Sequence, residues 1–142
     1  MHRYMIPVNH PLSFHRHLVM KIDVSHGEHL DKLSILELKL VRISDEEKLL
    51  NIRKEHSLLK PLAAEIIKTA GDLYDRLAEV NSELWEIEDR IRELEARQDF
   101  SDAFTTVARS VYRLNDERSQ VKREINRQTG SNLIEEKSYA GG

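Results

Sequence analysis

The chain of 142 residues contains no cysteine, only three prolines and five glycines, and 6% aromatic residues. The absence of cysteine argues against a small secreted domain that disulfide bonds hold together. No stretch approaches the ~18 consecutive apolar residues that a membrane-spanning helix needs. Residues 1–19 also lack the continuous apolar core of a secretory signal. These absences predict a cytoplasmic protein with no membrane partner.

Charged residues, by contrast, are abundant and of both signs. They make up 33% of the chain, with 22 basic and 25 acidic residues, a mixture typical of long exposed helices with narrow apolar seams. Residues 1–19 hold two arginines and no acid, which leaves 20 basic and 25 acidic residues, a net charge of −5, on residues 20–142. An acidic body of this kind argues against nucleic acid as a partner.

The first 19 residues differ from the rest of the chain. Pro7 and Pro11 interrupt them, and no helical or strand period runs through them. Regular patterning begins at a second methionine, Met20. We therefore predict that residues 1–19 form a disordered extension, and we hypothesise that Met20 is the true start of the protein.

Residues 20–142 are predicted to form one helical domain that ends in a tail over residues 131–142. Capping boxes, in which a serine precedes an acidic residue by three positions, begin at Ser25 and Ser44 and indicate helix starts. Proline removes a backbone donor and clashes with the preceding turn, so we expect a break or kink near residue 60, at Pro61. The four predicted helices span about residues 27–43, 45–59, 62–97 and 102–128.

The last two of these helices carry matching apolar seams, with residues alternating four and three positions apart in the heptad pattern of coiled coils. The seams consist of Leu73, Leu77, Val80, Leu84, Ile87, Ile91 and Leu94, and of Phe104, Val107, Val111, Leu114, Val121 and Ile125. A tight turn after Phe100 separates them. We therefore predict an all-α fold, an antiparallel helical bundle built on a long C-terminal coiled-coil-like hairpin.

The two ends of the helical region carry weaker signals. Gly130 follows the last seam in the position of a glycine C′ cap. Residues 20–24 and 132–139 are short and partly alternating, which makes them candidates for a pair of β-strands. A lone two-stranded ribbon is only marginally stable.

Three polar residues interrupt apolar seams and are the first candidates for a special role. They are Glu37 in the first helix, His56 in the second and Arg118 in the last. An unpaired buried charge costs several kcal/mol, so Glu37 and Arg118 should find partners. We interpret them first as a buried or half-buried ion pair that fixes helix register, with ligand binding and catalysis as the alternatives.

Recognisable catalytic or metal-binding motifs are missing from the sequence. His26 and His29 lack the i, i+4 spacing of a zinc-binding helix, and no second strong ligand pair accompanies them. No phosphate-binding loop, nucleophile elbow or pair of catalytic carboxylates can be identified. We therefore assign no catalytic residue, no metal and no cofactor.

One helical enzyme family shares part of the pattern. The run from Leu77 to Arg97 is similar to the first helix of the all-helical chorismate mutases. Those enzymes have a substrate-binding arginine where this chain has Asn81, an acid where it has Trp85, and a basic loop after the helix that this chain lacks. The similarity implies a chorismate-mutase-like activity only as an alternative.

A second resemblance spans most of the chain. From Met20 onward, the sequence resembles a bacterial family of short helical proteins with no assigned activity. The matching segments are residues 24–28, 31–39, 42–43, 49–53, 81–89, 108–118 and 130–139, and His29 departs from the family's apolar residue. The resemblance implies that the polar matches belong to a shared design. They include Asp31, Lys32, Glu37, Lys39, Arg42, Asn81, Trp85, Arg109, Tyr112, Asn115, Asp116 and Arg118.

The expected hairpin brings some of these polar residues together. Equal distances from the turn near residue 100 place Trp85 beside Asn115 and Asp116, and Asn81 near Arg118. Either a polar pocket with one tryptophan wall or a hydrogen-bonded layer that fixes register would result. The candidate ligand-binding residues are Glu37, Asn81, Trp85, Arg109, Tyr112, Asn115, Asp116 and Arg118.

Two functional hypotheses follow from the narrow seams and the polar cluster. The first is a non-catalytic helical interaction or scaffold protein that binds itself or another helical protein, because one hairpin buries only one side of each helix. The alternative is a small-molecule-binding or enzymatic helical domain with a polar pocket near Trp85 and Arg118.

Overall fold

The structure, a computed structural model, describes residues 19–139. In that part of the chain it contains three helices and no strand: α2 (His26–Arg42), α3 (Glu46–Ala96) and α4 (Asp102–Thr129). The predicted all-α class is therefore confirmed. The expected disordered extension concerns residues that, apart from Val19, lie outside the described part. Within that part, no helix is both long and apolar enough to cross a membrane.

The helix ends follow the predicted capping rules with one shift. The Ser25 hydroxyl accepts a hydrogen bond of 3.0 Å from the Glu28 amide and so begins α2. In α3, Asp45 takes this role in place of Ser44 and accepts from the Lys48 amide at 2.9 Å. Gly130 ends α4 in the left-handed conformation, with φ of 68°, which only glycine adopts at low cost.

The predicted break at Pro61 is wrong, and the expected second and third helices are one element. Pro61 is exposed, and so is Ser57, whose carbonyl loses its amide partner to the proline, and the helix continues through both. The bend lies instead at Ala70, whose φ of −120° and ψ of 34° are not helical. The residue that follows is Gly71, a poor helix former, and the buried Ala70 packs within the core.

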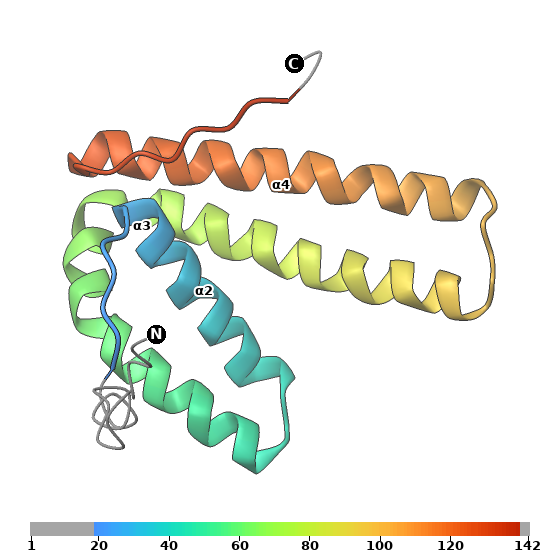
Figure 1. Ribbon diagram of the computed structural model, residues 1–142, viewed down its shortest axis with the longest axis horizontal. Coiled ribbons are helices and arrows are strands. Elements are labelled where there is room, and N and C mark those ends of the chain that lie inside the picture. Colours follow the sequence, from blue (N-terminus) through green and yellow to red (C-terminus); the bar gives the residue numbers. More distant parts are fainter. Residues whose placement is uncertain (1–18, 140–142) are drawn as a thin grey trace, which may run out of the picture.

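The bend makes α3 a V that encloses α2. Figure 1 shows α2 between the two halves of α3, and α4 running back alongside the half that follows Ala70. The main core lies where α2, α3 and α4 meet, and a smaller cluster of Leu36, Leu49 and Ile52 lies between α2 and the first half of α3. The main core consists of Leu30, Leu33, Ala63, Ile66, Ala70, Leu77, Val121 and Ile125.

Beyond the end of α2, α3 and α4 extend together as a projection that we call the arm, residues 86–113 (Figure 1). An ion pair between Arg42 and Glu86 marks the point where α2 leaves the hairpin. At the tip, the rings of Phe100 and Phe104 meet edge to face with centroids 5.3 Å apart. The arm therefore depends on the single contact line between two helices.

The tail after α4, residues 130–139, passes the start of α2 and runs back along α4 (Figure 1). The expected strand pair between residues 20–24 and 132–139 does not form. The tail instead bonds through side chains, because the N-terminus of α2 and the side of α4 offer it polar partners. Ser131, for example, accepts from the His26 amide at 3.2 Å.

Candidate functional site

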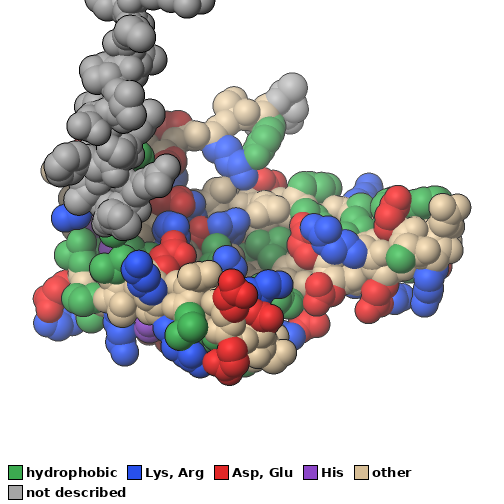
Figure 2. Space-filling view, turned by 60° about the horizontal axis from the view of Figure 1, so that its bottom comes forward, with side chains coloured by type: hydrophobic (Ala, Val, Ile, Leu, Met, Phe, Trp, Pro, Cys, Tyr) green, Lys and Arg blue, Asp and Glu red, His purple; other side chains and the backbone are tan. Residues whose placement is uncertain are grey.

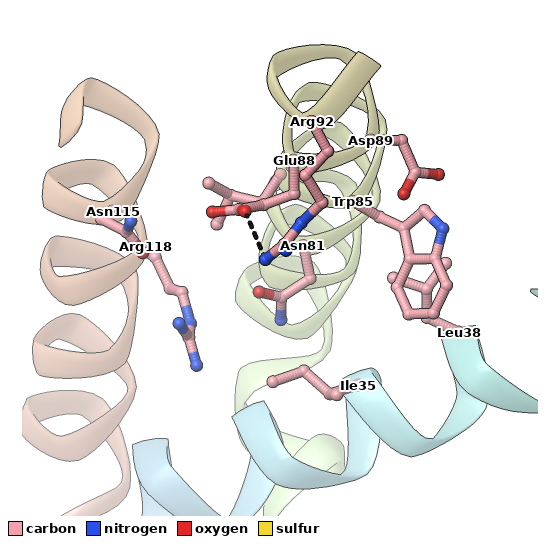
Figure 3. Close-up of a pocket in the computed structure, with 10 residues that line it drawn as sticks. Ile35, Leu38, Asn81, Trp85, Glu88, Asp89, Arg92, Asn115 and Arg118 are labelled. Carbon is pink, nitrogen blue, oxygen red and sulfur yellow. Dashed lines mark hydrogen bonds and ion pairs between the residues drawn. The ribbon is translucent and has the colours of Figure 1, made fainter. Parts of the chain in front are cut away.

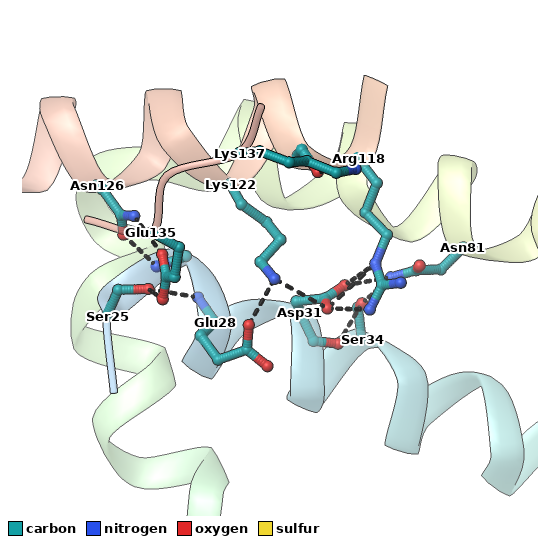
Figure 4. Close-up of polar contacts among 12 residues, drawn as sticks. Ser25, Glu28, Asp31, Ser34, Asn81, Arg118, Lys122, Asn126, Glu135 and Lys137 are labelled. Atoms are coloured by element: carbon teal, nitrogen blue, oxygen red, sulfur yellow. Dashed lines mark hydrogen bonds and ion pairs between the residues drawn. The ribbon is translucent and has the colours of Figure 1, made fainter. Parts of the chain in front are cut away.

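Asp31 is the centre of a buried polar network between α2, α3 and α4 (Figure 4). Its side chain is 1% exposed, and Arg118 of α4 contacts both carboxylate oxygens, with Nε at 3.0 Å from Oδ1 and 3.1 Å from Oδ2. Hydrogen bonding to Asp31 raises the pKa of Arg118. The guanidinium is therefore a fixed cation, held in one orientation by two acceptors.

Asn81 of α3 joins the same network. Its Nδ2 donates to Asp31 Oδ1 at 2.9 Å and to Ser34 Oγ at 2.7 Å, and Ser34 in turn donates to the Asp31 carbonyl at 2.8 Å. The Asp31 carboxylate can only accept hydrogen bonds, so the atom of the Asn81 amide that faces it must be the nitrogen. Asn81 is 5% exposed.

A pocket of about 450 Å³ lies next to this network, and Asn81 and Arg118 belong to both (Figure 3). Trp85 and Arg118 stand on opposite sides of Asn81, and residues of α2 close the base. At the rim of the pocket, Arg92 Nη2 lies 3.4 Å from Glu88 Oε2. The lining consists of Ile35, Leu38, Asn81, Leu84, Trp85, Glu88, Asp89, Arg92, Asn115 and Arg118. It thus combines an aromatic wall, an apolar base and polar groups.

The structure brings together four of the eight candidate ligand-binding residues. Asn81, Trp85, Asn115 and Arg118 line the pocket. Arg109 and Tyr112 are exposed on the arm, away from the pocket. Asp116 is also exposed, and its carboxylate lies 3.7 Å from Lys137 of the tail.

Glu37 does not pair with Arg118, which corrects the predicted buried ion pair. Its carboxylate is half exposed and accepts from the Tyr74 hydroxyl at 2.8 Å, with His56 Nε2 at 3.4 Å from the other oxygen. Burial and this hydrogen bond raise the pKa of Tyr74. The prediction assumed one packed face on α2, whereas α2 lies inside the V and has partners on several sides.

Sequence reasoning missed the central role of Asp31. A usable signal was present, because Gly27, Asp31 and Ser34 are spaced four and three apart and form a second stripe beside the leucines. Gly27 and Asp31 of this stripe face α4, and Ser34 contacts Asn81 of α3. The Gly27 amide donates to Asn126 Oδ1 at 2.6 Å, and a Cβ on Gly27 would lie 2.4 Å from the Lys122 carbonyl oxygen.

The tail completes the network at the start of α2 (Figure 4). The Ser25 hydroxyl donates to one carboxylate oxygen of Glu135, and Asn126 Nδ2 donates to the other at 3.2 Å. Between this contact and Asp31, the Lys122 ammonium bonds to Glu28 and lies 3.7 Å from Asp31. The tail is therefore attached through charged groups.

Acid is expected to loosen this attachment. Partial burial works against the charged form of Glu135, but the hydrogen bonds from Ser25 and Asn126 outweigh it and lower the pKa. Because the folded-state pKa is lowered, the stabilisation is present at neutral pH and is lost as the pH falls below about 4. Glu135→Gln should cost about 1 kcal/mol of unfolding free energy at pH 7, and much less at pH 3, by urea titration.

Glu136→Gln is the matched control, since Glu136 pairs at 2.6 Å with the exposed Arg123 and should contribute nothing measurable. A cost at Glu135 that did not shrink in acid would contradict the assignment.

Residues 19–139 contain no group of three or more His, Cys, Asp or Glu side chains placed to hold a metal ion.

Comparison with known proteins gives one match. The model of DUF6165, described as a family of unknown function, matches residues 20–142. No curated protein matches the chain, and no solved structure does.

Proposed function

The chain belongs to the DUF6165 family of unknown function, and we propose that it is a non-catalytic helical interaction protein that pairs with a second copy of itself through the arm. The arm then acts as a coiled-coil-like hairpin, and two arms form an antiparallel four-helix bundle.

The observation that carries this proposal is the incomplete burial of the arm. Most of its seam residues are only half buried, although they face the partner helix: Ile87, Ile91, Phe104, Val107 and Val111. Phe100 and Tyr112 are 57% and 54% exposed. Two helices bury only one line of contact, and narrow-seamed helices owe most of their stability to tertiary packing. A second hairpin would cover the open sides.

The charges of the arm favour another copy of the same arm as the occupant. Residues 86–96 of α3 carry five acidic and two basic residues, whereas residues 102–113 of α4 carry two arginines and one acid, Asp102. Hydrophobic side chains lie among these charges on the surface of the arm (Figure 2). A two-fold axis that places α3 of each copy against α4 of the other brings opposite charges together.

Reversing the charge of the basic side should weaken this pairing. The double variant Arg109→Glu/Arg113→Glu changes two exposed side chains and should weaken the dimer at least tenfold, because like charges then face each other. Sedimentation equilibrium over a concentration series measures the change, and circular dichroism checks the fold. The matched control is Arg53→Glu/Lys54→Glu, which reverses two exposed charges on the first half of α3.

A complementary variant tests the orientation. Glu93→Arg/Glu95→Arg makes the acidic helix basic, so this chain should pair with Arg109→Glu/Arg113→Glu better than either pairs with itself. A chain that stays monomeric at its highest soluble concentration would overturn the proposal, and so would equal weakening by the control.

A further inference from the structure

The pocket beside Trp85 has a role that the arm does not explain. We propose that it binds an uncharged, planar heterocycle that carries a hydrogen-bond donor next to an acceptor, the chemistry of a free purine or pyrimidine base.

The first support is a nearly buried polar side chain with a free atom. Asn81 is 5% exposed, and its Nδ2 is used by Asp31 and Ser34. Among the described residues, Asn81 Oδ1 has no hydrogen-bond partner, yet no fully buried side-chain oxygen or nitrogen there lacks one. Oδ1 is therefore open to the pocket as an acceptor. Arg118 Nη1 is open as a donor in the same way, because Nε and Nη2 are the atoms that bind Asp31.

The Asn81 amide and the Arg118 guanidinium are neighbours, because Asn81 Nδ2 and Arg118 Nε both bind Asp31 Oδ1. A pair of one acceptor and one donor matches a lactam or amidine edge, as on a nucleobase. A carboxylate ligand offers only acceptors, so it could use the Arg118 donor but would meet the Asn81 oxygen with repulsion. The network thus favours a ligand with a donor and an acceptor side by side, and it disfavours a carboxylate.

The charge of the pocket leads to the same ligand class. Its lining contains two acids, Glu88 and Asp89, and two bases, Arg92 and Arg118. Arg92 lies beside Glu88, and Arg118 is already neutralised by Asp31. No net positive charge remains to hold an anion. For this reason we do not propose a chorismate-mutase-like activity, whose substrate is a dicarboxylate.

The remaining surface suits a flat ring. Trp85 provides an aromatic face at one end of the pocket, and Ile35, Leu38 and Leu84 provide apolar contact. Stacking on an aromatic side chain contributes about 1–3 kcal/mol per base. The volume of about 450 Å³ lies within the range of small-molecule sites.

Trp85 is the only tryptophan of the chain, so its fluorescence reports directly on the pocket. We expect adenine, hypoxanthine or cytosine to change the emission in a saturable manner when the full chain is titrated. Benzoate, a flat anion, and inorganic phosphate should produce no saturable change. A flat response to all three heterocycles would overturn the proposal, and so would tighter binding of benzoate.

A pocket-filling variant tests the location. Asn115→Phe places a ring at a half-buried lining position that makes no side-chain hydrogen bond among the described residues, and it should weaken heterocycle binding at least tenfold by calorimetry. Asn51→Phe, an exposed change on the first half of α3, is the matched control and should bind as the unmodified chain does. Equal affinity of the two variants would assign the ligand to another place.

Discussion

Replacement of Asp31 by alanine is expected to lower the unfolding free energy by about 3–5 kcal/mol, because it leaves the half-buried Arg118 guanidinium without its counter-charge. Asn81 loses an acceptor at the same time. Urea unfolding at pH 7, followed by circular dichroism, measures the loss. Few exposed positions in a helical protein of this size should approach it.

Glu37→Ala is the control, because Glu37 is an acid on the same helix that the sequence had paired with Arg118. Its carboxylate is half exposed and bonds to Tyr74 and His56, so its loss should cost less than about 1 kcal/mol. Double-mutant cycles with Arg118→Ala should show strong coupling to Asp31 and additive effects with Glu37. Coupling of Arg118 to Glu37 instead of Asp31 would contradict the pairing of Arg118 with Asp31.

The second large effect is expected at Gly27. An alanine Cβ there would lie 2.4 Å from the Lys122 carbonyl oxygen and 2.9 Å from its carbon, so α2 and α4 must separate. Because both obstructing atoms are backbone, we expect Gly27→Ala to cost about 2–3 kcal/mol in the same urea experiment.

Gly71 provides the matched control for this substitution. The nearest atom to a Cβ at Gly71 is Ile67 Cγ2 at 3.9 Å, an ordinary contact. Alanine is the better helix former by about 1 kcal/mol, so Gly71→Ala should be neutral or stabilising. If the two glycine variants behaved alike, the close approach of α2 and α4 would not be a determinant of stability.

Periodicity predicted the helices because backbone preference and apolar spacing depend on residues that are close together in the sequence. The first helix was expected over 27–43 and the last over 102–128, within a residue of α2 and α4. Pro61 misled the prediction because its cost depends on whether the freed carbonyl reaches water, which only tertiary structure decides. The bend at Ala70 has no strong local signal beyond the neighbouring Gly71.

The site was predicted in part for a similar reason. Counting from the turn placed Asn81 near Arg118, and both indeed bind Asp31. Asp31 itself was missed as their partner, because its position opposite Arg118 follows from the packing of α2 inside the bent α3. Counting residues from the turn between α3 and α4 cannot reveal this packing, because α2 is not part of that hairpin.

The hydrogen bond between Ser25 and Glu135 joins residues 110 positions apart in the chain. During synthesis, α2 leaves the ribosome long before its counterparts on α4 and in the tail exist. Its buried aspartate then remains without Arg118, and its capping serine without Glu135, until those later segments emerge. We therefore expect assembly of the three-helix junction to be a late event rather than a step that begins at the first helix.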